Sequence, residues 1–206
     1  MKVQVAIDRV NLDKAEELIH ALSGEVDIIE MGTSLTMEFG VRQLAALVNI
    51  AGDSAVLADI KTCDEGKYEF DTGYECGFSH LTVMGAASSE TVRVCYESAK
   101  AHHREIMIDL IGCDEARVRE LCEFSDAIFY LHTSIDAPQP PSPLAEIRRF
   151  KEQFPQLARL AISADGHLDE IADLAGEGVE ILIMGPTINA ADDPVAAGRA
   201  VLSKFR

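Results

Sequence analysis

The sequence lacks an excess of positive charge, and this absence limits the partners that the protein can have. Its 18 lysines and arginines stand against 35 acidic residues, which gives a formal net charge of −17 at pH 7. The basic residues are scattered along the chain and form no stripe. Nucleic acid and anionic membranes would repel such a protein. We therefore expect no nucleic-acid partner and no membrane partner, and the composition fits an acidic enzyme.

Long apolar runs are also missing. No run approaches the length of about 18 residues that a membrane-spanning helix needs. The N-terminus enters a strand-like pattern at Val3, Val5 and Ile7, without the basic and apolar regions of a signal peptide. We therefore expect neither a membrane span nor a signal peptide, and we predict a cytoplasmic protein.

Cysteines in a metal-binding or disulfide pattern are absent as well. The cysteines are odd in number and show no C-x-x-C spacing, which favours reduced thiols over disulfides or a zinc site. Cys63 lies among charged residues, but no histidine neighbours it in sequence to activate it as a nucleophile. The five cysteines are Cys63, Cys76, Cys95, Cys113 and Cys122.

What the sequence does contain is a regular alternation of strand-like apolar runs and helical patterns, which indicates a parallel sheet with helical crossovers. With 206 residues, 48% of them hydrophobic, the chain can form one domain with a sizeable core. Eight such units in this length favour a closed barrel over an open sheet. We therefore predict an α/β fold, a single-domain (β/α)8 TIM barrel over residues 1–206. The predicted strands cover residues 3–8, 27–32, 55–61, 80–85, 106–112, 127–133, 160–165 and 180–185.

The segments between these strands carry apolar residues at helical spacing. The first follows Asn11, a good N-cap, and ends at Ser23 and Gly24. The segment 137–143 differs, because its four prolines exclude a helix or an inner strand. It is either a rigid flap over a site or a simple surface linker. The predicted helices cover residues 12–22, 41–50, 65–76, 88–102, 114–124, 144–154, 168–175 and 194–205.

Ionisable residues close six of the eight predicted strands, whereas the earlier strand positions are almost entirely apolar. In a barrel of this type, the carboxyl ends of the strands carry the active site. Buried charges without partners would be costly, so these residues must neutralise one another or a ligand. An active site at this rim is our prediction, and a structural polar layer is the alternative. The residues are Asp8, Glu30, Asp59, Lys61, Asp109, His132 and Asp165.

The segment around Asp59, Lys61 and Asp64 is the centre of this prediction. Alternate side chains of an extended strand share a face, so Asp59 and Lys61 should point to one side with Leu57 beneath them, and Ile60 to the other. A solvated ion pair at a strand end is the simpler interpretation of the same residues. The other ionisable residues at the rim favour an active site over this simpler interpretation.

The residue types at the rim indicate a particular chemistry. Glu30 and Asp59 are hard oxygen ligands, which suit Mg²⁺ better than zinc. Lys61 should stay cationic beside two acids and act as an electrostatic stabiliser. His132 is the candidate proton carrier, because histidine is the side chain best suited to move protons at neutral pH, although a merely structural histidine at a strand end is the alternative. Together these groups could stabilise an enediolate.

Several segments carry a resemblance to a known family. They are 57–66, 28–33, 83–85 and 108–112, and the similarity extends from Val5 to Pro194. These segments resemble 3-hexulose-6-phosphate synthase and 3-keto-L-gulonate-6-phosphate decarboxylase, of the orotidine monophosphate decarboxylase suprafamily of (β/α)8 barrels. The D-x-K-x-x-D motif at Asp59, Lys61 and Asp64 is its most specific part.

The resemblance implies Mg²⁺ near Glu30 and Asp59, an enediolate stabilised by Lys61, and His132 as the proton-transfer group. It also implies that Asp64 reaches the site of a neighbouring subunit, so a homodimer with shared active sites is expected. Both family reactions pass through a 1,2-enediolate of a pentulose phosphate. The candidate catalytic residues are Asp8, Asp59, Lys61, Asp64 and His132.

The loops after the seventh and eighth strands depart from the family pattern. Family members place glycine pairs there whose N–H groups hold the phosphate. Here Pro186 has no N–H to donate, and Asp165 brings negative charge toward an anion. Both changes weaken phosphate binding, which leaves a diverged substrate or a lost activity open. The candidate substrate-binding residues are Asp109, Asp165, Gly166, His167, Gly185 and Thr187.

We therefore expect a Mg²⁺-dependent carbon–carbon lyase that acts on a ketose phosphate. The synthase reaction, between formaldehyde and ribulose 5-phosphate, is favoured because Ile135 stands where the decarboxylase resemblance would require arginine. The decarboxylase reaction is the alternative. A non-catalytic sugar-phosphate-binding barrel is the alternative from another class, motivated by Asp165 and Pro186.

Overall fold

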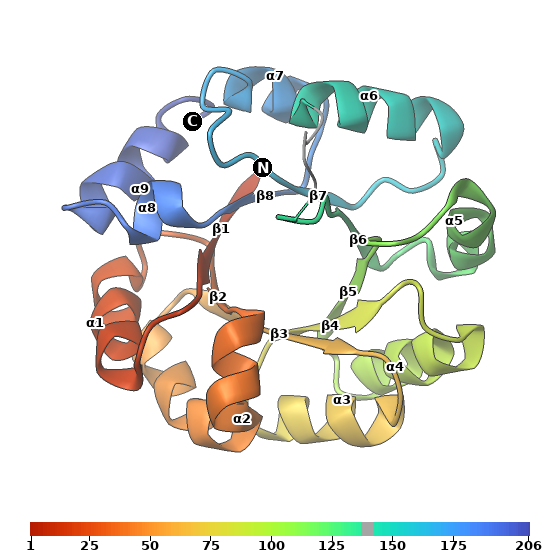
Figure 1. Cartoon of the computed structure of the whole chain (residues 1–206), viewed down its shortest axis with the longest axis horizontal. Coiled ribbons are helices and arrows are strands. Elements are labelled where there is room, and N and C mark those ends of the chain that lie inside the picture. Colours follow the sequence, from red (N-terminus) through yellow and green to blue (C-terminus); the bar gives the residue numbers. More distant parts are fainter. Residues whose placement is uncertain (137–141) are drawn as a thin grey trace.

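The computed structural model describes residues 1–136 and 142–206. In these residues, parallel strands close into a barrel in chain order, and helices surround it (Figure 1). The predicted TIM barrel is therefore confirmed. The strands are β1 (Lys2–Ile7), β2 (Ile28–Met31), β3 (Ala55–Thr62), β4 (His80–Met84), β5 (Glu105–Asp109), β6 (Ile128–Leu131), β7 (Leu160–Ser163) and β8 (Ile181–Met184).

Several of the helices begin at residues whose side chains accept hydrogen bonds from free backbone N–H groups. Asn11, for example, accepts a hydrogen bond from the N–H of Lys14 at 2.9 Å, and Ser88 and Asp114 cap later helices in the same way. The helices are α1 (Leu12–Leu22), α2 (Thr33–Val48), α3 (Gly66–Glu75), α4 (Ser89–Ala101), α5 (Glu115–Leu121), α6 (Pro143–Gln153), α7 (Ile171–Gly176), α8 (Pro186–Asn189) and α9 (Pro194–Leu202), with short 3-10 turns at Asn49–Ala51 and Cys122–Phe124.

The α2 helix differs most from the sequence prediction, which began it at Val41. It begins at Thr33, and Gly40 interrupts it with φ 71° and ψ 152°. This left-handed φ suits glycine and breaks the helical periodicity, so the half before Gly40 could not be recognised. The short helix α8 was also not predicted.

The proline-rich segment predicted over 137–143 falls mostly outside the described residues, which exclude 137–141. Its last proline, Pro143, was wrongly excluded from a helix. Pro143 is the first residue of α6, after the N-cap Ser142. Proline is tolerated there because the first N–H groups of a helix have no helical partner.

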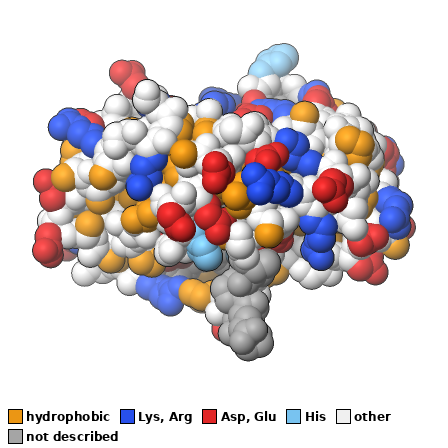
Figure 2. Space-filling view, turned by 90° about the horizontal axis from the view of Figure 1, so that it is seen from above, with side chains coloured by type: hydrophobic (Ala, Val, Ile, Leu, Met, Phe, Trp, Pro, Cys, Tyr) orange, Lys and Arg blue, Asp and Glu red, His pale blue; other side chains and the backbone are white. Residues whose placement is uncertain are grey.

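The barrel interior is layered, because side chains of each strand alternate between inside and outside. An apolar layer crosses the middle, and polar side chains lie two residues further along several strands. On the face shown in Figure 2, acidic and basic side chains of the described residues are mixed with one another. No described helix is long and apolar enough to cross a membrane. The apolar layer consists of Ile28, Leu57, Met107, Ile128, Ala161, Ile181 and Ile183.

A buried histidine lies at the opposite end of the barrel from the predicted site. His80 is 5% exposed, and its Nδ1 lies 2.8 Å from the hydroxyl of Ser79, which itself donates to the carbonyl of Val56. The Nε2 atom has no partner among the described residues. Burial lowers the pKa of His80 to about 4. The imidazole is therefore neutral in the folded protein at physiological pH.

This histidine should make the fold sensitive to mild acid. In the unfolded chain it protonates below its ordinary pKa of 6.5, whereas in the folded protein it stays neutral until about 4. The unfolded state then binds more protons, and stability falls as the pH falls through this window. Between pH 7.5 and 5.5, the wild type should lose about 1 kcal/mol more of its free energy of unfolding than His80→Gln. Urea unfolding of both proteins measures this difference, and equal losses would contradict the assignment.

Candidate active site

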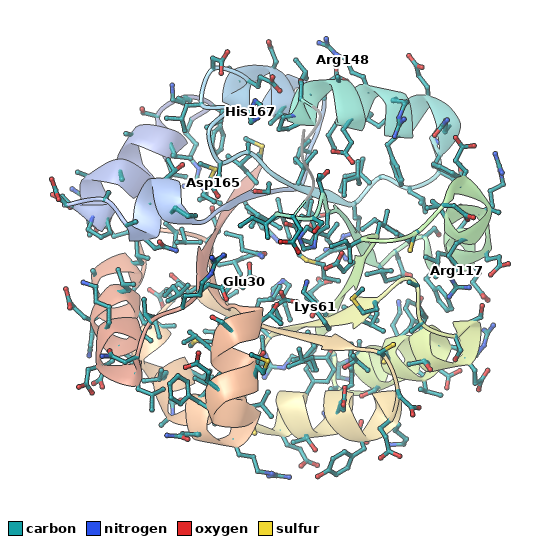
Figure 3. All side chains as sticks on the ribbon, viewed as in Figure 1. Glu30, Lys61, Arg117, Arg148, Asp165 and His167 are labelled. Atoms are coloured by element: carbon teal, nitrogen blue, oxygen red, sulfur yellow. The ribbon has the colours of Figure 1, made fainter. Side chains whose placement is uncertain are left out.

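The mouth of the barrel lies at the carboxyl ends of the strands, where the sequence predicted the site. Glu30 and Lys61 lie inside the ring of strands, whereas Arg117 and Arg148 lie on the outer helices (Figure 3). Asp165 lies nearer to α8. The ionisable side chains therefore form an inner group on β2 to β6 and a second group on the loops after β7 and β8.

Lys61 is at the centre of the inner group. Its Nζ lies 2.7 Å from Oδ2 of Asp109 and 3.1 Å from Oδ2 of Asp59. Asp59 and Lys61 do share a face, as predicted, and Ile60 packs on the outer core. Simple alternation is not the reason, because the β3–β4 register shifts between Ala58 and Thr62. A bulge thus directs Lys61 into the mouth.

The backbone at Lys61 has a left-handed conformation, with φ 46°. Such a φ is uncommon for a residue other than glycine and needs support from its surroundings. The N–H of Lys61 donates to the hydroxyl of Thr82 at 2.9 Å, and that hydroxyl donates to Oδ1 of Asp59 at 2.7 Å. Thr82 therefore fixes both the bulge and the neighbouring carboxylate.

Asp109 joins the lysine to the histidine. Its side chain is fully buried, and the same Oδ2 that accepts from Lys61 lies 2.7 Å from Nδ1 of His132. Its Oδ1 accepts from the N–H of Ile111 at 2.9 Å. Burial alone would raise the pKa of Asp109, but the hydrogen bond and charge of His132 and the ammonium of Lys61 lower it overall. Asp109 is therefore an anion that orients two cationic or proton-carrying groups.

The same contacts determine the states of Lys61 and His132. Burial works against the charge of Lys61, but Asp59 and Asp109 outweigh it and raise the lysine pKa. Because Asp109 is an acceptor, Nδ1 of His132 carries a proton, and in the neutral ring Nε2 is free to accept one. The imidazole stacks on the ring of Tyr130, with centroids 4.4 Å apart. Lys61 is thus a cation, and Nε2 of His132 is the atom that can accept a proton.

Glu30 and Asp59 form a buried acidic pair. Glu30 is 7% exposed and accepts from Nε2 of Gln4 at 2.6 Å, and Asp59 accepts from the hydroxyl of Thr33 at 2.5 Å. Burial, followed by the charge of Asp59, raises the pKa of Glu30 to about 8. The pair therefore has too little positive charge near it.

This deficit fits a divalent cation. No cluster of three or more metal-ligating side chains occurs in residues 1–136 and 142–206. Two carboxylates are nevertheless the donor set that Mg²⁺ takes when water and substrate oxygens complete its shell. Glu30 and Asp59 are therefore the residues that could hold this ion.

Two further candidate residues lie differently. Asp8 accepts from the N–H and the hydroxyl of Ser34, at 3.0 and 2.7 Å, and a Cβ at Gly32 would clash with its carboxylate. Asp8 thus fixes the start of α2. Asp64 is exposed, and its carboxylate accepts from the N–H of Glu65 at 2.8 Å. Asp64 has no hydrogen bond to the inner group among the described residues.

The second group surrounds Asp165. Its carboxylate accepts from the N–H of Gly185 at 2.5 Å and from that of Thr187 at 3.0 Å. These are N–H groups that could have bound a phosphate. Gly166 is exposed, and Nδ1 of His167 lies 3.6 Å from a carboxylate oxygen of Glu170, so these two residues do not join the inner group.

Sequence reasoning missed the polar side chains that hydrogen-bond to the acids, and also Tyr130, which stacks on His132. Thr82 and Tyr130 could have been found, because each lies on a strand at a spacing of two from another inward-facing residue. Gln4 could have been found in the same way on β1. Thr33 and Ser34 could not, because they belong to the unrecognised half of α2.

The chain is similar to known proteins along most of its length. The model of the Orotidine 5'-phosphate decarboxylase / HUMPS family matches residues 1–201. The 3-hexulose-6-phosphate synthase of Staphylococcus haemolyticus is 30% identical over 202 residues, which cover 97% of this chain and 96% of the relative. The crystal structure of 3-hexulose-6-phosphate synthase from Salmonella typhimurium has a TM-score of 0.90 and 28% identity, covering 100% of this chain and 98% of that one.

A more distant structure shows the same fold. The 3-keto-L-gulonate-6-phosphate decarboxylase from Vibrio cholerae has a TM-score of 0.84 and 22% identity, and the match covers 100% of this chain and 98% of that chain. The predictions of a lyase and of its suprafamily are confirmed. The chain belongs to the orotidine 5'-phosphate decarboxylase / HUMPS family.

Proposed function

We propose that the protein is a Mg²⁺-dependent carbon–carbon lyase that converts a ketose to its 1,2-enediolate and adds formaldehyde to it, as 3-hexulose-6-phosphate synthase does with ribulose 5-phosphate. The observation that carries this proposal is the shared oxygen of Asp109, which holds Lys61 and His132 side by side. An ammonium for the oxyanions and an imidazole for the proton are then available at one place.

The proposed chemistry follows from the states of these groups. Nε2 of His132 removes a proton from C1 of the ketose, and the negative charge moves onto the carbonyl oxygen at C2, next to the hydroxyl oxygen at C1, so that a 1,2-enediolate forms. Lys61, a fixed cation, stabilises this charge without donating its own proton. Bound by Glu30 and Asp59, Mg²⁺ would supply further positive charge to the same oxygens. C1 of the enediolate then attacks the carbon of formaldehyde, whose C=O π bond breaks, and the resulting alkoxide takes back the proton that Nε2 of His132 holds.

Decarboxylation of a keto acid, the reaction of the second family resemblance, is a further candidate because it produces the same enediolate at the same groups. The exposed side chain of Ile135, which follows His132 closely, favours the synthase reaction because it offers no charge for proton delivery. A non-catalytic barrel would not need an imidazole and an ammonium on one carboxylate.

Replacement of Lys61 tests the electrostatic part of the proposal. With Mg²⁺, formaldehyde and ribulose or ribulose 5-phosphate, Lys61→Ala should lower kcat by about 10²–10³-fold or more. Lys67→Ala is the matched control, because Lys67 is exposed and pairs with Asp71 on α3, outside the barrel mouth. Absence of turnover by the wild type with these ketoses and with 3-keto-gulonate 6-phosphate would reject the lyase proposal.

Replacement of Asp109 tests the positioning of Lys61 and His132. In Asp109→Asn, the amide can donate to Nδ1 of His132 and leave the proton on Nε2, where it blocks base catalysis. We expect kcat/KM to fall about 10²–10⁴-fold. Because Lys61 also loses an anion that raises its pKa, the basic limb of the pH–rate profile should move to lower pH. Asp126→Asn, at an exposed acid that pairs with Lys100, is the control. An unshifted basic limb would contradict the assignment.

We further propose that the active unit is a homodimer, in which Asp64 completes the site of the second subunit. Met37 and Tyr68 are 80% and 64% exposed, and Tyr68 lines an apolar groove of about 400 Å³ between α2 and α3 with Phe39 and Ile60. Apolar side chains exposed around such a groove are typical of an interface. Asp64 precedes α3, one of the two helices that border this groove, by two residues.

Mixing inactive variants tests the shared site. Homodimers of Asp64→Ala and of His132→Ala should each be inactive, whereas random exchange of their subunits should restore about one quarter of the wild-type activity, since half of the dimers gain one intact site. Mixing Lys61→Ala with His132→Ala is the control and should restore none, because both residues serve the same subunit's site. No recovery in the first mixture, after exchange is verified by mass spectrometry, would contradict the proposal.

A further inference from the structure

We propose that Asp165 excludes a phosphate group from the far end of the barrel mouth and binds a hydroxyl group there, so that the preferred ketose is unphosphorylated at the end remote from the reaction. This inference rests on the proposed function, because it specifies the substrate class of the same site. The observation behind the inference is that both oxygens of the Asp165 carboxylate accept hydrogen bonds from the loop after β8.

Two backbone donors at this end of the mouth already have an acceptor. Barrels of this class often bind phosphate with the loops after β7 and β8 and the N-terminus of a short extra helix. Here the short helix α8 begins at Pro186, which has no N–H. The N–H groups on either side of it, at Gly185 and Thr187, both donate to Asp165. A phosphate would have to displace the carboxylate to reach them.

The contact between Asp165 and this loop also depends on the glycine at position 185. A Cβ placed on Gly185 would lie 3.2 Å from Oδ2 of Asp165, so the absence of a side chain at Gly185 lets the carboxylate approach the backbone. The carboxylate accepts with both oxygens, one for each N–H. Asp165 thus occupies the place of an anion rather than pointing into solvent.

The charge at this end of the mouth is unfavourable for phosphate. Among the described residues, no Lys, Arg or His forms an ion pair with Asp165, and the ammonium of Lys61 pairs with Asp59 and Asp109 instead. Burial, and then the charges of nearby acids that include Asp165, raises the pKa of Tyr130 well above its usual value. The carboxylate of Asp165, which has no cationic partner among the described residues, would therefore repel a phosphate dianion.

A hydroxyl group suits the acceptor positions of the Asp165 carboxylate that remain free. A carboxylate has about four acceptor positions, and the two N–H groups use only part of them. A sugar hydroxyl can donate to a free position without displacing the carboxylate and without adding charge. The same residue thus accepts a terminal hydroxyl and rejects a terminal phosphate.

The experiment compares D-ribulose with D-ribulose 5-phosphate as substrates, in the presence of Mg²⁺ and formaldehyde. The wild type should have a kcat/KM for ribulose at least about 10-fold higher than for ribulose 5-phosphate, and Asp165→Gly should shift this ratio toward the phosphate ester by about 10–100-fold. Asp165→Asn, which keeps the shape and removes the charge, should shift it in the same direction by less. Asp169→Asn removes an exposed acid nearby and should leave the ratio unchanged.

Binding of inorganic phosphate separates this inference from the proposed reaction. Phosphate should raise the Tm of Asp165→Gly and leave those of the wild type and Asp169→Asn unchanged. If no protein turns over either ketose but this pattern of Tm shifts is found, the reaction is wrong and the role of Asp165 stands. If the wild type prefers ribulose 5-phosphate or is stabilised by phosphate, the inference is overturned while the lyase reaction remains. Stabilisation of none of the three proteins by phosphate would overturn it as well.

Discussion

The arrangement of the barrel mouth depends on one buried anion, the carboxylate of Asp109. A fully buried charge is strongly destabilising unless cationic groups and hydrogen bonds compensate it. Asp109 obtains this compensation from Lys61 on β3, from His132 after β6 and from the backbone N–H of Ile111, two residues further along its own chain segment. Three strands are thereby held in one relative position. The groups that compensate the charge are also the groups that the chemistry needs, so stability and reactivity depend on the same contacts.

The two other buried acids of the mouth are held in a different way. Glu30 and Asp59 receive hydrogen bonds from an amide and from hydroxyls, which position a carboxylate without neutralising it. Lys61 contributes to Asp59 but is shared with Asp109. The raised pKa of Glu30 is the consequence of this arrangement. A pair of acids that is held by hydrogen bonds but lacks nearby positive charge is suited to a bound cation, because the ligands are oriented before it arrives.

The sequence predicts the barrel well because strand and helix periodicities are local properties. The strands that lead to Glu30, Asp59, Asp109 and His132 were predicted for that reason, although β5 and β6 end earlier than expected, at Asp109 and Leu131, and the meeting of these residues at one rim follows from the topology. The bulge at Lys61 was not predictable, because Thr82 on the next strand supports it. The first half of α2 was missed because Gly40 interrupts its periodicity. The contact of Asp165 with the β8 loop joins residues about twenty positions apart, and no spacing in the sequence indicates it.

The two ends of the mouth are supported by different parts of the barrel, and this separation lets them diverge independently. β3, β5 and β6 hold the lysine, the aspartate and the histidine, whereas the loops after β7 and β8 hold Asp165. A change in the second group alters which terminal group fits without moving the ammonium or the imidazole, because the hydrogen bonds of the two groups share no residue. Membership of the family is therefore informative about the reacting end of a substrate and weakly informative about its other end. For this chain, the terminal group is better inferred from the contacts of Asp165 than from the names of relatives about 30% identical.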